Sequence, residues 1–453
     1  MKTTLKWTAI TVGAVLVAAA TYIVFNTFDC EPPDISKFAN SFEMPSEADN
    51  VYCGLAATTN VVSGKTGLPV LTSVFDKYAD AWNKFNHPSK DMSAEEKDAI
   101  LAEAEKVLSL FHEAARRKTW CAVDPLGKRD PFPALGTFIR LCRLADLQAR
   151  RHLELGKTGA AIEGVRDMIL LTRKIEQDAE SAVRWLAAGG ALYYADGTAL
   201  RIISSGKATD EELLRLQDAL RQFDLASRSE RVERMMNNDF TIFFTRMADR
   251  KTLLAPENSE LAPKMLRVPI LGFYAYHHNR TWTTYARYVE KMKEGYRLGY
   301  DRAAWSKIED DLRILLESSS PWRFGPNFAG KKLLAGGVPA WSGIGTHIMR
   351  ANFQHSSAET IVAAARFKRK TGSFPKNLAE LVPEYLSAVP RDPFAQNAEI
   401  KYDAARGIIW TVGPDGTFDG ETATPDAGGK HGGKGKYGKN SRSVFNISGV
   451  PAE

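Results

Sequence analysis

Histidine is the residue type in this chain best suited to bind a metal or to act as a general base near neutral pH. The densest histidine group is the pair His277-His278, with His347 and His355 further along the chain. Neighbouring residues on a helix point about 100° apart, so two adjacent histidines rarely share one ion. The spacing therefore favours polar or hydrogen-bonded core histidines over a metal site.

Motifs of the common enzyme classes are absent from the sequence. His112 is followed by Glu113, but the second histidine of a metalloprotease helix is missing. The chain also lacks the Gly-x-Ser-x-Gly elbow, the P-loop and the dinucleotide-binding glycine pattern. We therefore nominate no catalytic residue, although residues distant in the sequence can still assemble a site in space.

The chain has four cysteines, Cys30, Cys53, Cys121 and Cys142. None of them has the CxxC or Cys/His spacing of a zinc site. In an exported protein thiols oxidise, and four cysteines allow three pairings. We prefer nearest-neighbour pairing, Cys30 with Cys53 and Cys121 with Cys142, and leave the other pairings open.

Export itself is predicted by the first 34 residues. An apolar run from Trp7 to Phe28 is 22 residues long and would rise about 33 Å as a helix, enough to cross a hydrocarbon layer roughly 30 Å thick. Lys2 and Lys6 precede it, and acidic residues follow it at Asp29, Glu31 and Asp34. This charge distribution predicts a single-pass signal anchor in a bacterial inner membrane, with the N-terminus cytoplasmic and the bulk periplasmic.

The same residues allow alternatives to this anchor. A cleaved signal peptide has a shorter apolar core; the segment 18–20 offers a small-residue cleavage site, but 22–25 continues the apolar run beyond it. A lipoprotein needs small residues before its acylated cysteine, and Cys30 follows Thr-Phe-Asp. Lysines on one side and acids on the other disfavour a buried helix of a soluble protein. Cleavage stays open, and the pairs Ala9/Gly13 and Ala14/Ala18 would let two copies of the helix pack as a homo-oligomer.

Composition indicates an ordinary folded protein. The 453 residues are 44% hydrophobic and 25% charged, which excludes wholesale disorder. A net charge of +6 with interspersed signs does not resemble the concentrated basic face of a nucleic-acid binder. The length allows two or three domains. We predict a mostly α chain with an anchor at 1–28, a helical domain at 29–344, a small α+β domain at 345–420 and a Gly/Lys-rich tail with a last short strand at 421–453.

Helical periodicity dominates from about residue 70 to 350. Capping boxes begin helices at Ser93-Ala-Glu-Glu96 and Thr209-Asp-Glu-Glu212. Glycines at 156 and 206 are predicted to end helices. The further predicted helices cover 158–177, 182–205, 227–250, 282–300 and 303–317. Short turns between helices are typical of stacked antiparallel hairpins.

Two stretches interrupt the helical pattern. Residues 255–272 hold three prolines, and residues 318–345 are rich in Ser, Pro and Gly with interleaved aromatic residues. Long irregular segments are sometimes functional. We favour the simpler interpretation that the aromatic side chains pin the second stretch onto the helices.

The C-terminal part carries the most distinctive order of elements. A long helix is expected at 345–370, followed by an aromatic-Pro step at Phe374-Pro375, a short Leu-rich helix and a turn at Pro390-Arg-Asp-Pro-Phe394. Residues 399–402 and 407–412 read as the strands of a hairpin, and 443–447 as a last strand. Gly413-Pro-Asp-Gly416 follows the hairpin.

This order resembles the globular part of the major pseudopilin of type II secretion systems, the protein G-like family. The whole chain resembles uncharacterised bacterial membrane-anchored proteins in which a helical region precedes such a module. The N-terminus lacks the signature of the pseudopilin-processing peptidase, and about 300 residues separate the apolar span from the module. We therefore expect a permanent tether rather than a fibre subunit.

The resemblance also implies a calcium site. Major pseudopilins bind calcium in the loop that matches 413–420, where Asp415 and Asp419 would be the metal ligands. Calcium takes six to eight oxygens, and these two carboxylates with backbone carbonyls would begin such a set. The competing interpretation, which we prefer, is that each Asp-Gly pair simply builds a tight turn.

Two function classes remain from the sequence. The first is an extracytoplasmic scaffold or interaction protein, anchored in the inner membrane through residues 7–28, with protein partners in the cell envelope and no nucleic acid. It would be associated with a type II secretion or pilus-like system. The alternative is an exported, hydrolase-like enzyme with a site between the helical domain and the 318–345 loop.

Overall fold

The structure is a computed structural model of the 453-residue chain. It describes residues 2–25, 28–34, 36–38, 45–85, 92–119, 135–177, 179, 181–247, 276–297, 305–308, 310–311, 326–337, 341–395, 398–414, 416 and 444–448. The predicted loop at 255–272 and most of the predicted helix at 303–317 lie outside these residues.

The N-terminal helix α1 extends from Lys2 to Phe25, and its described side chains are those of residues 11–23. None of the described helices combines the length and the apolar character that crossing a membrane requires. The short 3-10 helix η1, Ser36–Phe38, follows α1.

The chain divides into two compact units, and each is built from segments that are separate in the sequence. The first unit takes residues 1–40, 236–297 and 303–342. The second takes residues 41–235, 298–302 and 343–453. The predicted boundaries at 29, 345 and 421 are not tested by this division and stay predictions.

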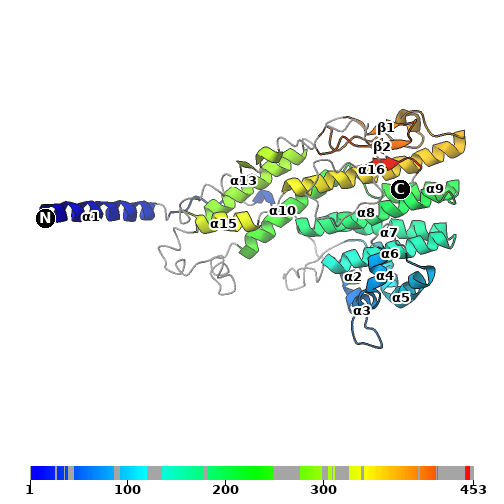
Figure 1. The fold of residues 1–453 in the computed structure, drawn as a ribbon, viewed down its shortest axis with the longest axis horizontal. Helices are drawn as coiled ribbons and strands as arrows, with labels where there is room; N and C mark the ends of the chain where they lie inside the picture. Colours follow the sequence, from blue (N-terminus) through cyan, green and yellow to red (C-terminus); the bar gives the residue numbers. More distant parts are fainter. Residues whose placement is uncertain are drawn as a thin grey trace. The chain divides into compact units, whose positions relative to one another are not determined.

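The second unit is a stack of helices. They are α2 Val51–Thr59, α3 Val70–Lys77, α4 Ala79–Phe85, α5 Ala94–Arg116, α6 Leu135–Glu154, α7 Thr158–Gln177, α8 Ala182–Ser204, α9 Asp210–Arg221 and the first residues of α10, Arg228–Met247. Helices α6, α7 and α8 lie side by side (Figure 1). The mostly α class is thereby confirmed.

Local sequence signals set several helix ends. Ser93 and Thr209 each form a reciprocal capping box with the glutamate three residues on, as predicted. Gly156 and Gly206 have φ of 71° and 65°, a left-handed conformation that glycine adopts without a steric penalty. The short α6–α7 and α8–α9 connections follow from these residues.

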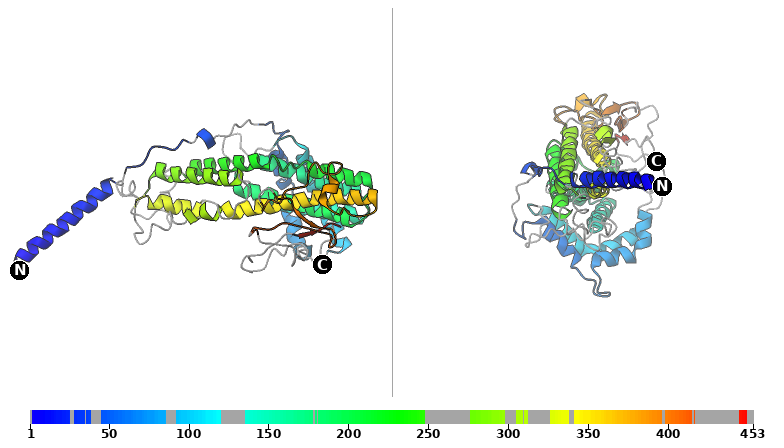
Figure 2. Two further views of the ribbon diagram at one scale, coloured as in Figure 1. Left: turned by 90° about the horizontal axis from the view of Figure 1, so that it is seen from above. Right: turned by 90° about the vertical axis from the view of Figure 1, so that its left-hand side faces the viewer.

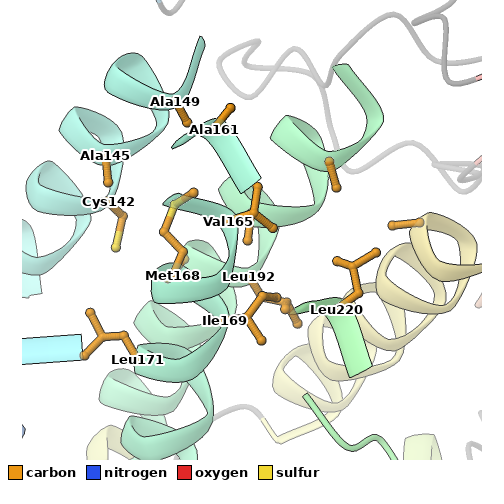
Figure 3. Close-up of a cluster of buried hydrophobic side chains, with 14 of the residues drawn as sticks. Cys142, Ala145, Ala149, Ala161, Val165, Met168, Ile169, Leu171, Leu192 and Leu220 are labelled. Carbon is orange, nitrogen blue, oxygen red and sulfur yellow. The ribbon is translucent and has the colours of Figure 1, made fainter. Parts of the chain in front are cut away.

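Small and medium apolar side chains from α6, α7, α8 and α9 fill the centre of this unit (Figure 3). Cys142, Ala145 and Ala149 of α6 face Val165 and Met168 of α7. A Cβ at Gly164 would lie 3.3 Å from the Cβ of Ala149, so small residues set the close α6–α7 approach.

The C-terminal elements share the core of the second unit. The long helix α16, Trp341–Thr371, is followed by the 3-10 helix η4, Leu378–Leu381, and by three strands, β1 Lys401–Asp403, β2 Ile408–Trp410 and β3 Val444–Asn446. The strands form an antiparallel sheet of order β1-β2-β3, pairing Tyr402 with Ile409 and Ile409 with Phe445.

The predicted hairpin and last strand are confirmed by this sheet. The sheet lies beside α16 (Figure 2), where the rings of Phe353 and Phe445 are 5.7 Å apart. The predicted short Leu-rich helix is the 3-10 helix η4.

The first unit contains the remainder of α10, helix α13 His278–Arg297 and helix α15 Phe328–Gly337. Its α13–α15 contact depends on Gly330. A Cβ at that position would lie 2.0 Å from Oγ1 of Thr281 and 2.2 Å from Oδ1 of Asn327, so only glycine fits without displacing them.

Candidate functional site

The segment that follows α1 is fastened to the first turn of α13. The carboxylate of Asp29 accepts hydrogen bonds from the backbone N–H groups of Asn279 at 2.6 Å and Arg280 at 2.9 Å. The side-chain amide of Asn279 donates in return to the carbonyl oxygen of Cys30 at 2.7 Å. A carboxylate that accepts N–H groups at a helix N-terminus stabilises that helix and is favoured by its dipole.

A second attachment lies nine residues further along the chain. Phe38 is fully buried and stacks on Phe240 of α10, with ring centroids 4.1 Å apart. Phe240 in turn packs edge-on against Trp282 of α13 at 6.1 Å. The hydroxyl of Thr241 donates to the Phe38 carbonyl oxygen at 3.3 Å, and the ammonium of Lys293 lies 5.1 Å from the Phe38 ring.

We call Asp29, Cys30 and Phe38, together with their contacts on α10 and α13, the tether clamp. Asp29 is four residues after Phe25, so at most about 14 Å separates the Cα atom at the end of α1 from the Cα atom of Asp29. The clamp thus restricts the segment after α1, which would otherwise act as a flexible linker.

The histidines nominated from the sequence occupy separate environments. His277 is buried just before α13. Its backbone N–H donates to Oδ1 of Asn327 at 2.8 Å, and its backbone carbonyl oxygen accepts from the Thr281 hydroxyl. His278 packs against the ring of Trp282 at 6.2 Å. His347 is exposed on α16. Among the described residues no group of three or more His, Cys, Asp or Glu side chains is arranged to hold a metal ion.

His355 of α16 forms a buried pair with Asp196 of α8. Nδ1 of the imidazole lies 2.8 Å from the carboxylate, Nε2 lies 3.2 Å from the carbonyl oxygen of Leu220, and both side chains are 1% exposed. Burial alone would lower the pKa of His355, but the facing carboxylate of Asp196 reverses this and raises the pKa. The pair holds α8 and α16 together. Because both ring nitrogens already have partners, neither is available to exchange a proton with a substrate.

A buried ion pair adjoins this histidine. Arg228 of α10 contacts Glu176 of α7 through two nitrogens, at 2.5 Å and 3.2 Å, and its guanidinium lies 4.3 Å from the ring of Trp185. Arg228 also donates to the side chain of Asn352 on α16. Burial raises the pKa of Glu176 despite Arg228 and Arg231. The cluster joins α7, α8, α10 and α16 of the second unit.

His112 of α5 forms a second histidine–aspartate pair that is partly open to solvent. Nδ1 lies 2.8 Å from Asp167 of α7, and Nε2 lies 2.7 Å from Oε1 of Gln148 on α6. Burial lowers the pKa of His112, but the hydrogen bonds to Asp167 and Gln148 outweigh it and raise the pKa. Arg116 also approaches Asp167, at 3.5 Å.

The C-terminal Pro-x-Asp-Pro turn contains a structural aspartate. The carboxylate of Asp392 is 3% exposed and accepts from the N–H groups of Phe394 and Val412 and from the Thr411 hydroxyl. It thereby fixes the chain as it leaves β2. The predicted calcium ligands Asp415 and Asp419 lie outside the described residues.

The cysteine prediction requires a correction. Cys30, Cys53 and Cys142 are free thiols, so the preferred Cys30–Cys53 bond is absent; Cys121 lies outside the described residues. Cys142 is fully buried between α6 and α7, and this burial raises its thiol pKa. It serves as a small apolar core residue.

Sequence reasoning missed the two histidine–aspartate pairs and the tether clamp, because their members are 55 to 253 residues apart. The only sequence signal for these pairs was the residue type, histidine or aspartate, because no spacing pattern connects the two members. Comparisons with family models, with curated proteins and with solved structures found no match to this chain.

Proposed function

We propose that the chain is a membrane-anchored extracytoplasmic scaffold, held in a bacterial inner membrane by residues 7–28 and offering helical hairpins to protein partners in the cell envelope. A type II secretion or pilus-like system is the proposed setting, on the resemblance of the C-terminal module. The tether clamp carries this proposal, because it attaches the segment just after the proposed anchor to α10 and α13.

The exposed apolar side chains of α1 support an anchor. Four apolar side chains of α1 that point in different directions around the helix are each 53% to 67% exposed: Val12, Val15, Leu16 and Val17. Exposing this much apolar surface to water is unfavourable, and a hydrocarbon environment would remove the penalty. The lysines before the run and the acids after it give the proposed orientation.

The clamp gives the anchor a mechanical consequence. A tether that is attached at Asp29 and again at Phe38 leaves only three residues between the end of α1 and its first attachment to α13. A scaffold would benefit from this arrangement because its first unit is attached close to the proposed anchor. The alternative, an exported hydrolase-like enzyme, has less support because both histidine–aspartate pairs described above have partners on both ring nitrogens.

Fusion of a periplasm-dependent phosphatase after Asp34 tests the topology. We expect high phosphatase activity, and no activity from a cytoplasm-dependent reporter fused at the same position. A variant that replaces Lys2 and Lys6 by glutamate is the matched control, since it should reduce the fraction inserted in the proposed orientation. An inactive phosphatase fusion would overturn the proposal.

Crosslinking in the native envelope tests the scaffold role and its setting. Recovery of secretion or pilus components with the full-length chain would support the setting. Recovery of other envelope proteins alone would retain the scaffold but remove the secretion link. A chain that crosslinks to no envelope protein would contradict the scaffold itself.

A further inference from the structure

Three charged side chains on one face of α6 lie opposite three polar or charged side chains of α8 in the second unit. Arg143, Asp146 and Arg150 are three and four residues apart, so they share one face of α6. Tyr194, Thr198 and Arg201 have the corresponding spacing on α8. We call these six residues the arginine seam.

The contacts within the seam join the two lines. Nε of Arg143 donates to the Tyr194 hydroxyl oxygen at 2.8 Å. One turn along, the fully buried carboxylate of Asp146 accepts from the Thr198 hydroxyl at 2.5 Å. The guanidinium groups of Arg150 and Arg201 lie 2.9 Å and 3.7 Å from the same carboxylate.

The seam carries an excess of positive charge. Its six residues include three guanidinium groups and one carboxylate, which leaves two positive charges beyond neutrality among them. The next turn of α6 adds the exposed Arg140, whose guanidinium lies 5.2 Å from the ring of Phe75. Arginine stays charged at every physiological pH, so this excess is permanent.

The seam is also held in place and reaches the surface. Arg150 is fixed by Asp146 and by the ring of Phe85, 4.5 Å away, yet its side chain is 20% exposed. The Arg201 side chain is 37% exposed. Arginines that are already positioned lose little conformational freedom when they bind a further anion, which favours binding.

We infer that the arginine seam is a docking surface for an acidic segment of a protein partner. Carboxylates are favoured because arginine can bind them through two parallel hydrogen bonds. One carboxylate, that of Asp146, already lies between the guanidinium groups of Arg150 and Arg201. The α6 part of the seam spans about 10 Å, the length of three extended residues. This is short for a nucleic-acid backbone, which binds along longer basic surfaces.

The inference names a partner class for the proposed scaffold and so rests on that proposal, but it can fail separately. The assay uses the full chain in detergent micelles and a fluorescein-labelled hexaglutamate peptide, followed by fluorescence anisotropy. Topology does not enter this measurement, so a failed phosphatase fusion leaves it interpretable. We expect binding that weakens as ionic strength rises.

Two variants and one control locate the binding. The double variant R140Q/R143Q should raise the Kd about tenfold, since each substitution removes a charge-assisted contact with the peptide. R166Q is the matched control, because Arg166 is an exposed arginine on α7 that pairs with Glu163 at 3.3 Å. Its Kd should equal that of the wild type. Circular dichroism melting curves of R140Q and of the double variant check that the fold is intact.

Three outcomes would overturn the inference. The first is an unchanged Kd in the R140Q/R143Q variant with an intact fold. The second is an equal loss of affinity in R166Q, which would indicate general attraction to the whole surface. The third is a single-stranded oligothymidylate that binds as tightly as the peptide, which would identify a general polyanion surface.

Discussion

Two histidine–aspartate pairs in the second unit have the same 2.8 Å separation but different surroundings. His355 and Asp196 are both 1% exposed and adjoin the buried Arg228 and Glu176. The side chain of His112 is 23% exposed, and its partner Asp167 is also approached by the 64% exposed side chain of Arg116. The His355–Asp196 pair therefore links helices in the interior, and the His112–Asp167 pair links helices close to the surface.

The comparison teaches that surroundings, more than pair geometry, decide what a charged pair contributes. Removing one partner of a buried pair leaves a charge with no water to solvate it. If His112 is removed, its partner Asp167 is still buried, but the largely exposed Arg116 remains beside it and can compensate for the lost partner. The cost of truncation should therefore differ although the separations are equal.

The largest effect is expected for His355→Ala. Asp196 would remain buried opposite a cavity, and breaking a buried pair in this way typically costs about 3–5 kcal/mol. Urea denaturation followed by circular dichroism measures the loss. Asp218→Ala, an exposed change on α9, is the control and should leave the unfolding midpoint unchanged. A loss as small as that control's would break the comparison.

His112→Ala should cost less, about 1–2 kcal/mol, because the buried Asp167 carboxylate loses one partner but keeps its contact with the guanidinium of Arg116. The same urea denaturation measures it. Equal losses at His112 and His355 would show that exposure does not distinguish the pairs.

Ser93→Ala sharpens the comparison by measuring the helix that carries His112. Loss of the Ser93 cap of α5 should cost about 1 kcal/mol, as N-caps usually do. Thr209→Ala at the equivalent cap of α9 is the matched variant. If Ser93→Ala has no effect while Thr209→Ala does, α5 unfolds separately, and the His112 result then reports only local stability.

The smallest effect is a pH dependence. The folded-state pKa of His112 is raised above its usual value near 6.5, so its stabilisation is complete below that pH and declines as the pH rises through the folded-state pKa. His112→Gln should therefore reduce the fall in unfolding free energy between mildly acidic and mildly alkaline pH. Denaturation of both proteins across that range measures the difference. Parallel pH profiles would show that His112 does not titrate differently in the folded state.

Sequence patterns predicted the elements whose determinants are local. The bounds 158–177 match α7 because Gly156 ends the preceding helix and the apolar period is regular. Both capping boxes and the β1–β2 hairpin were predicted for the same reason. These signals lie within a few residues of the feature that they specify.

Long-range contacts explain the misses. We predicted the start of α13 at residue 282, but it begins at His278 because Asp29, about 250 residues earlier, accepts its first N–H groups. The His355–Asp196 pair spans 159 residues and has no local pattern. The sequence suggested polar or core histidines, and it could not identify their carboxylate partners.

The close approach of Gly330 to Thr281 and Asn327 limits which substitutions this protein can accept. Every other amino acid would place a carbon 2.0 Å from the Thr281 hydroxyl oxygen. A substitution at 330 thus requires the side chains of both Thr281 and Asn327 to shift or to be replaced. In a deep mutational scan, this small residue should tolerate change as poorly as the buried tryptophan at 282.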